Sequence, residues 1–350
     1  MLQVAPVGRE IIDAWPVAES GLPVRVVNSV AAAGIVMVGQ LRGQNDRRLL
    51  GLRSLGRISL GHVHSFYRIC GQIEQGRQRF QNIQEVFSLF LDRPEMHVLQ
   101  ARYGFARSEL SASRNAATLQ EIGNAEQKTR ERIRQVQDAA LRRLQSRLAQ
   151  LCLQPFLDFF AAFLDARGGV VACPDLEPLA RDPLLGGHNI CGVLLLLADL
   201  RIGALTFRNG CFATLREAVL AGIEAAARAV LEKQSKPVSL DDLTRALPEP
   251  ARQGLGGRGR QAMACILDHG SGMAATNDGR YFLFAGGTHA FLVEVLRGIE
   301  RPAHYRTIAN AFNDHLKPLS RKGAGFMLDT LNACPQCVRV DRCIYDLKSV

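Results

Sequence analysis

The chain has 350 residues and a mass of 38.4 kDa, with an apolar fraction of 47%, a charged fraction of 22% and a mean hydropathy of zero. This length exceeds that of one ordinary core and predicts several small domains. The composition excludes a largely disordered chain. Even with glycine counted as apolar, no uninterrupted apolar run exceeds ten residues, whereas a membrane span needs roughly 20.

The cysteines and the first twenty residues both bear on location. The nine cysteines are an odd number, and most lie in apolar periodic stretches. This pattern favours reduced, buried thiols over a disulfide framework. The first twenty residues lack a basic stretch followed by an apolar block and do not resemble a secretory signal. We therefore expect a cytoplasmic protein without a membrane partner.

The positive charge is concentrated near the start of the chain. The net charge is +10 at a sequence pI of about 9.4, and the first 150 residues carry +8 of it. Only six of the 43 basic residues are lysine. Because the planar guanidinium of arginine favours bidentate contacts with phosphate and guanine, this charge favours a nucleic acid partner. An anionic membrane surface and plain solubility are the alternatives.

Three segments make up the first 150 residues. Residues 1–20 contain two prolines and little periodicity and predict a tail. Residues 21–75 predict a small unit of short helices joined by glycine turns, with one turn at Gly56. Residues 76–150 predict longer amphipathic helices, one of which ends at Gly104.

After residue 150, one pattern of helix, short extended run, helix and β-hairpin occurs three times, over 151–214, 215–287 and 288–350. In the second copy, Ser239 is a plausible N-cap and an Asn-Asp-Gly turn at 277–279 precedes a strand. Each copy has the size of a winged helix, in which two or three helices pack on a small antiparallel hairpin. We therefore predict a mainly α fold, with tandem small helical domains followed by winged-helix α+β repeats.

The most specific motif lies at 118–144. Thr118 and Glu121 form a capping box that starts a short helix, and Gly123 suits the turn that ends it. Thr129 can cap a second helix, whose apolar residues fall on one face and whose polar residues fall on the other. This pair predicts a helix-turn-helix whose second helix reads a major groove. A solvated helix in a bundle is the alternative.

This motif resembles region 4 of bacterial housekeeping sigma factors, in which T-L-x-E-[IV]-G leads after five residues into T-R-E-R-[IV]-R-Q. The match has no gaps, and residues 97–104 are similar to the preceding helix of the family, so the resemblance covers about 80–150. Glu126 and Lys128 stand where the family's turn is usually apolar. The resemblance implies contacts with the bases of a promoter −35 element by Arg130, Glu131 and Gln135, with Arg132 and Arg134 near the phosphates.

Residues 20–72 are similar to the C-terminal domain of the RNA polymerase alpha subunit, on segments that include Leu22-Pro-Val-Arg-Val-Val-Asn-Ser-Val30 and Leu55-Gly-Arg-Ile-Ser-Leu60. In that family an Arg, an Asn and a helix-hairpin-helix turn with Gly and Ser grip the minor groove of A·T-rich DNA. A helix-hairpin-helix that mediates only protein contacts is the alternative. The resemblance implies minor-groove and phosphate contacts by Arg25, Asn28, Gly56, Arg57 and Ser59.

Ile58 stands where the alpha-subunit family usually has a lysine. In the last copy, Cys334, Cys337 and Cys343 lack an obvious fourth zinc ligand, and we interpret them as residues of a hairpin core. The chain contains no Walker loop, nucleophile elbow or H-E-x-x-H motif. We therefore expect no catalytic residue, no cofactor, no metal and no enzymatic activity.

Together these features predict a nucleoid-associated protein that binds double-stranded DNA with a sequence preference. We expect a transcription regulator that contacts promoter-like DNA, with RNA polymerase or another protein subunit as a candidate partner. The alternative is an architectural or targeting subunit that recruits a separate enzyme of a defence or mobile-element system. In a third interpretation the winged helices are protein-binding scaffolds, because residues 151–350 carry only +2.

Overall fold

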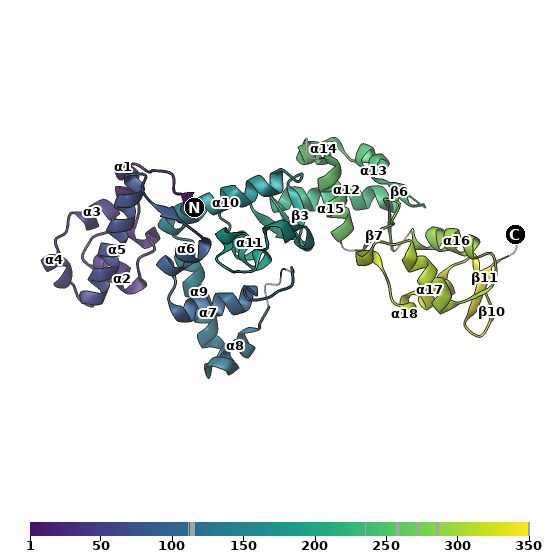
Figure 1. Cartoon of the computed structure of the whole chain (residues 1–350), viewed down its shortest axis with the longest axis horizontal. Coiled ribbons are helices and arrows are strands. Elements are labelled where there is room, and N and C mark those ends of the chain that lie inside the picture. Colours follow the sequence, from purple (N-terminus) through teal and green to yellow (C-terminus); the bar gives the residue numbers. More distant parts are fainter. Residues whose placement is uncertain are drawn as a thin grey trace. The chain divides into compact units, whose positions relative to one another are not determined.

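The computed structural model describes residues 1–110, 112, 116–234, 236–256, 259–270, 272–284 and 287–348. The chain divides into two compact units, which comprise Met1–Phe163 with Cys173–Leu205 and Leu164–Ala172 with Thr206–Val350. Helices dominate the described residues, and the strands form small antiparallel sheets (Figure 1). The predicted mainly α fold class is confirmed.

The first twenty residues fold as part of the first unit, so the predicted tail is wrong. Strand β1 (Leu2–Gln3) pairs antiparallel with β2 (Arg79–Phe80), and helix α1 (Arg9–Asp13) follows. Ile12 and Trp15 are buried. Because the partner strand of β1 lies far along the chain, no local periodicity in residues 1–20 reveals this pairing.

The predicted unit of short helices is present. Asn45 caps one of these helices by accepting a hydrogen bond from the backbone of Arg48 at 2.9 Å. The side chain of Arg42 forms ion pairs with Asp13 of α1 at 3.1 Å and with Glu74 of the unit's last helix at 2.5 Å, which joins α1 to this unit. The helices are α2 (Val24–Ala32), α3 (Val38–Arg42), α4 (Asp46–Leu50) and α5 (Arg57–Glu74).

Two apolar helices complete the core of the first unit, α10 (Arg147–Asp165) and α11 (Ile190–Asp199). By length and composition alone, α10 could also cross a membrane. Cys152 and Phe156 on one face of α10 are fully buried, whereas Gln154 on another face is exposed. This amphipathic pattern is that of a helix in the core of a folded protein.

Three three-stranded sheets follow, and in each the last strand along the chain lies in the middle. Each sheet belongs to a sequence of helix, strand, helices and hairpin, so the predicted order of elements is confirmed. The sheets are β3 (Val170–Ala172), β5 (Cys211–Ala213) and β4 (Thr206–Arg208); β6 (Val238–Ser239), β8 (Arg280–Leu283) and β7 (Met273–Ala275); β9 (Ala303–His304), β11 (Ile344–Leu347) and β10 (Cys337–Asp341).

The second and third repeats supply most helices of the second unit. Ser239 caps α13 as predicted, by accepting a hydrogen bond from the backbone of Asp242 at 3.2 Å. The helices of the second repeat are α12 (Glu217–Glu232), α13 (Leu240–Ala246), α14 (Glu249–Leu255) and α15 (Gly259–His269). Those of the third are α16 (Thr288–Ile299), α17 (Tyr305–Asp314) and α18 (Ala324–Ala333).

Residues 151–214, predicted as one domain, are divided between the two compact units. The strands β3 and β5 belong to the second unit, where their side chains join the core of the second repeat. Val170 and Ala213 lie in one apolar cluster with Leu220 and Met263. The first sheet therefore buries apolar side chains against elements that the sequence assigns to the next domain.

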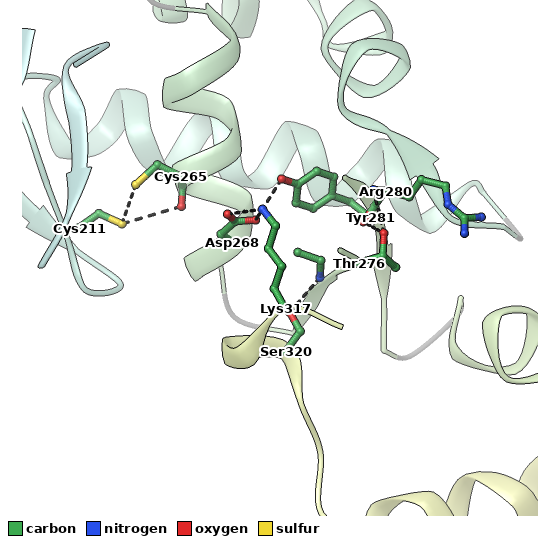
Figure 2. A network of polar contacts seen from close by, with 9 residues as sticks. Cys211, Cys265, Asp268, Thr276, Arg280, Tyr281, Lys317 and Ser320 are labelled. Carbon is green, nitrogen blue, oxygen red and sulfur yellow. Dashed lines mark hydrogen bonds and ion pairs between the residues drawn. The ribbon is translucent and has the colours of Figure 1, made fainter. Parts of the chain in front are cut away.

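A network of polar contacts joins the second and third repeats (Figure 2). Lys317 donates hydrogen bonds to both carboxylate oxygens of Asp268, at 2.9 and 2.7 Å, and the hydroxyl of Tyr281 donates to the same carboxylate at 3.0 Å. Burial raises the pKa of Tyr281. The backbone of Ala275 donates to the hydroxyl of Ser320 at 2.9 Å. These contacts fix the turn after α17 against α15 and β7.

Replacing Lys317 with methionine leaves the Asp268 carboxylate without its cationic donor. We expect K317M to weaken this junction by about 1 to 2 kcal/mol, because both groups are only partly buried. Amide hydrogen exchange of peptides covering α15 and residues 316–320 measures the change. The control is K236M, at an exposed lysine. Equal exchange in the two variants would contradict a stabilising role for Lys317.

Candidate nucleic-acid interface

Three helices of the first unit enclose a small core of their own, α7 (Arg93–Tyr103), α8 (Leu119–Glu126) and α9 (Arg130–Leu144), preceded by α6 (Ile83–Phe90). Each helix supplies one buried side chain to an apolar cluster, namely Val98, Ile122 and Ile133. Because these three residues share one core, the helices hold a fixed mutual orientation.

Side-chain caps define where these helices begin. The predicted capping box at α8 is confirmed: Thr118 accepts a hydrogen bond from the backbone of Glu121 at 3.2 Å, and Glu121 accepts one from the backbone of Thr118 at 2.6 Å. Thr129 caps α9 by accepting from the backbone of Arg132 at 3.2 Å. The capping box of α8 and the Thr129 cap of α9 satisfy amide groups that the helices themselves leave unpaired.

The turn between α8 and α9 differs from the prediction. Gly123 does not end α8, because the helix continues to Glu126 and Gln127 adopts the left-handed conformation with φ of 56°. The backbone of Lys128 donates a hydrogen bond to the carbonyl of Gly123 at 2.8 Å. A Cβ atom at Gly123 would lie 2.7 Å from the carbonyl oxygen of Lys128. The glycine is required there because the backbone of the turn crosses α8 closely.

An ionic cluster stabilises this polar turn. The carboxylate of Glu126 pairs with Lys128 at 2.6 Å and with His97 of α7 at 2.5 Å. The hydrogen bond from Lys128, followed by that from His97, lowers the pKa of Glu126 below its usual value. Glu126 and Lys128, which replace apolar residues of the sigma family, therefore hold the turn by charge rather than by apolar packing.

The exposed face of α9 brings the predicted base-contacting residues together. All five predicted side chains are exposed, and they lie opposite the buried Ile133 and Ala140. The side chain of Arg130 forms no hydrogen bond or ion pair with another described residue. The exposed residues are Arg130, Glu131, Arg132, Arg134 and Gln135.

The other charges on this face are paired along the helix. Arg134 donates to both oxygens of Glu131, at 2.8 and 2.7 Å, and forms an ion pair with Asp138 at 2.6 Å. Gln135 donates to Glu131 at 3.2 Å. The hydrogen bonds from Arg134 and Gln135 lower the pKa of Glu131 to about 2. Glu131 is thus an ionised acceptor that already binds donors from its own helix.

A second basic surface lies on the short-helix unit. The side chain of Arg25 donates to the carbonyl of Ser54 at 2.8 Å, which holds the first turn of α2 against the loop before α5. Asn28 lies one turn further along α2 and is exposed. Gly56 precedes α5 without a side-chain cap, so the first amides of α5 can bind an anion. Arg57 is exposed beside it.

Ser59 and Ile58, two other residues of this surface, differ in how exposed they are. Ser59 is half-buried in the first turn of α5. Ile58, which replaces the lysine of the alpha-subunit family, is 83% exposed and supplies no charge. The predicted surface therefore has one arginine from α2, one arginine from α5 and an uncapped helix N-terminus.

Two arginines that were not predicted as site residues line a groove together with Arg25. A groove of about 1200 Å³ in the first unit is lined by Arg25, by Arg142 of α9 and by Arg147 of α10, among apolar side chains. Glu19 forms an ion pair with Arg147 at 2.5 Å. The sequence shows that these arginines exist, but only long-range packing places Arg142 and Arg147 in the same groove as Arg25.

The comparison with known families assigns one of these segments. Residues 91–146 match the family model described as sigma-70, region 4. Helices α7, α8 and α9 therefore form a helix-turn-helix DNA-binding region of this type. No curated protein and no solved structure matches the chain. The similarity of residues 20–72 to the alpha subunit stays a prediction.

The close approach at Gly123 can be tested by adding one methyl group. We expect G123A to increase amide exchange in peptides of α8 and α9 by about tenfold or more, because overpacking against backbone costs about 1 to 3 kcal/mol. The control is G61A, at a helical glycine whose Cβ would meet nothing within 4 Å. G61A should leave exchange unchanged or slow it. Similar exchange in the two variants would refute the close approach.

The ionic cluster at the turn predicts a dependence on pH. Because the folded-state pKa of Glu126 lies below its usual 4.5, its pairing stabilises the fold above about pH 4.5 and is lost as the pH falls through the folded-state value. Urea unfolding followed by circular dichroism at neutral pH and near pH 3.5 should show a smaller loss of stability in E126Q than in the wild type. An identical loss in both proteins would contradict this role.

Proposed function

We propose that this protein is a transcription regulator that binds promoter-like double-stranded DNA with a sequence preference. The observation that carries the proposal is the exposed polar face of α9, on a helix-turn-helix that matches sigma-70 region 4. On that face Arg130 can pair with guanine, Glu131 can accept from cytosine and Gln135 can pair with adenine.

The paired charges on α9 favour discrimination between sequences. In the unbound chain Arg134 and Gln135 satisfy the carboxylate of Glu131. A cytosine amino group that replaces these donors frees Arg134 to contact a phosphate, and Arg132 lies on the same exposed face. Where the DNA presents no hydrogen-bond donor to Glu131, the carboxylate would keep its partners on α9 and repel the DNA phosphates. Glu131 therefore selects against wrong sequences as well as for the right one.

The basic surface of the short-helix unit would supply a second grip. We propose that Arg25, Asn28 and the first turn of α5 hold the minor groove and a phosphate of adjacent DNA, as in the alpha-subunit family that residues 20–72 resemble. Two weak sites on one chain raise overall affinity through their effective concentration. This arrangement would extend the bound site beyond the segment that α9 reads.

We further propose that the three helix-and-sheet repeats are winged helices whose role is protein contact. Residues 151–350 carry a net charge of only +2, which is too little for a strong hold on phosphate. RNA polymerase is the partner that a promoter-bound regulator would recruit. The same neutral repeats also favour the second candidate, a non-enzymatic targeting subunit in the cytoplasm that brings a separate nuclease or ATPase to DNA. Co-purification with polymerase core or with such an enzyme discriminates between these functions.

DNA binding by α9 can be measured by fluorescence anisotropy on a −35-like duplex and a scrambled duplex across a salt series. We expect the wild type to prefer the first duplex and to lose affinity steeply with salt. The triple variant R130A/E131A/Q135A should lose this preference by about tenfold or more, since each base contact is worth about 1 to 3 kcal/mol. The control R297A removes an exposed arginine from another helix.

The outcomes separate the candidates. Loss of preference in the triple variant alone supports sequence readout by α9. Equal binding of both duplexes by all variants would favour the non-specific targeting subunit. Absence of binding at low salt would contradict DNA binding by the chain as a whole.

A further inference from the structure

Three metal-ligating side chains meet in the second unit, and one of them, Cys211, is 54 residues from Cys265 in the sequence. The sulfur of Cys211 on β5, the sulfur of Cys265 on α15 and a ring nitrogen of His269 on α15 all lie within 4.8 Å of one another. Cys265 and His269 are four residues apart, so they lie on the same face of their helix. Figure 2 shows Cys211 and Cys265 pointing toward each other from the sheet and the helix.

A tight hairpin brings Cys211 to this helix. Strands β4 and β5 are joined by Asn209 and Gly210, which both have positive φ, at 50° and 79°. This conformation is typical of a two-residue hairpin turn with the Asn-Gly sequence. A Cβ atom at Gly210 would lie 3.6 Å from Nδ1 of His269. The turn therefore packs directly beside the imidazole and places the next residue, Cys211, at α15.

A small cavity with mostly apolar walls adjoins two of the three side chains. Its volume is about 20 Å³, and Cys211 and His269 line it together with Asn209 and Glu224. This volume holds about one water molecule. The buried carboxylate of Glu224, which also lines the cavity, accepts hydrogen bonds from Arg208 at 2.8 Å and from Asn209 at 3.3 Å, so the hairpin that carries Cys211 is held in place.

We propose that Cys211, Cys265 and His269 form a zinc site, with solvent as the fourth ligand. Thiolate and imidazole ligands in a tetrahedral arrangement are the set that zinc prefers among biological metals. On binding, each thiol transfers its proton to solvent, so one zinc ion displaces two protons from the cysteines. No change of oxidation state is required.

The distance between the two sulfurs favours a metal over a disulfide bond. The Sγ atoms of Cys211 and Cys265 lie 3.2 Å apart. Zinc–sulfur bonds of about 2.3 Å at a tetrahedral angle place two sulfurs about 3.8 Å apart. The two sulfurs would therefore have to move apart by only about 0.6 Å to bind zinc. A disulfide, at about 2.05 Å, would require the sulfurs to approach by more than 1 Å. His269, one helical turn after Cys265, supplies a third ligand, and a disulfide bond would have no use for it.

The zinc ion would fasten the hairpin of the first sheet to α15 of the second repeat. Elsewhere in the described residues, Cys334, Cys337 and Cys343 form no comparable group. The three ligands belong to the second unit, whereas the helices proposed to bind DNA belong to the first, and the zinc ion would have a structural role. It does not depend on the proposed function, because its ligands belong to neither surface.

The test uses the full chain, purified without added metal and kept reduced. We expect mass spectrometry of the elements to find about one zinc per chain. The apo protein should take up one Zn²⁺ in competition with a chromophoric chelator, and Co²⁺ should produce the charge-transfer absorption of thiolate ligands. C265S and H269Q should each bind Zn²⁺ at least tenfold more weakly. The control C343S, at a part-exposed cysteine outside the cluster, should bind like the wild type.

Circular dichroism of the apo proteins shows whether each variant is folded. If C265S does not fold, H269Q still tests the site, because it keeps both thiols in place. Absence of zinc uptake by the reduced wild type would overturn the proposal. Equal zinc affinity in H269Q and the wild type would also overturn it, because the histidine would then not be a ligand. Peptide mapping that finds a Cys211–Cys265 disulfide in freshly purified protein would replace the metal site with a redox pair.

Discussion

The orientation of α9 depends on one close approach between two backbone segments. The carbonyl of Lys128 passes so near to Gly123 that a Cβ atom there would lie 2.7 Å away, while the amide of Lys128 bonds to the Gly123 carbonyl. Any other residue would push α9 away from α8 and separate Ile122 from Ile133 in their shared core. The exposed face of α9 therefore points outward because a glycine lies inside α8.

This geometry explains why the polar turn is tolerated. A turn that is held by backbone contact and by the Glu126 ion pairs does not need the apolar residues that the sigma family usually places there. Charge then serves two purposes in the same motif. At the turn it fixes structure, whereas on α9 the exchangeable pairs of Glu131 and Arg134 leave the side chains able to change partner when DNA approaches.

Local sequence signals predicted local structure well. Caps such as Thr118 and Ser239 act within four residues, and both are present. Sequence reasoning failed where contacts span long separations, as in the pairing of β1 with β2 and the meeting of Cys211 with α15. It also assigned Gly123 to a helix end, because a glycine needed for close packing and one needed for a left-handed turn are alike in a single sequence. The candidate base-contacting residues could be predicted as one exposed set because a single helix carries them all.

In the proposed complex, α9 enters a major groove while the Arg25 surface holds a minor groove. Dimethyl sulfate footprinting tests both at once, since it methylates guanine N7 in the major groove and adenine N3 in the minor groove. On a duplex selected for tight binding, we expect protection of guanine N7 that R130A abolishes and protection of neighbouring adenine N3 that R25A abolishes. Unchanged guanine N7 methylation on DNA that the protein fully occupies would contradict the account.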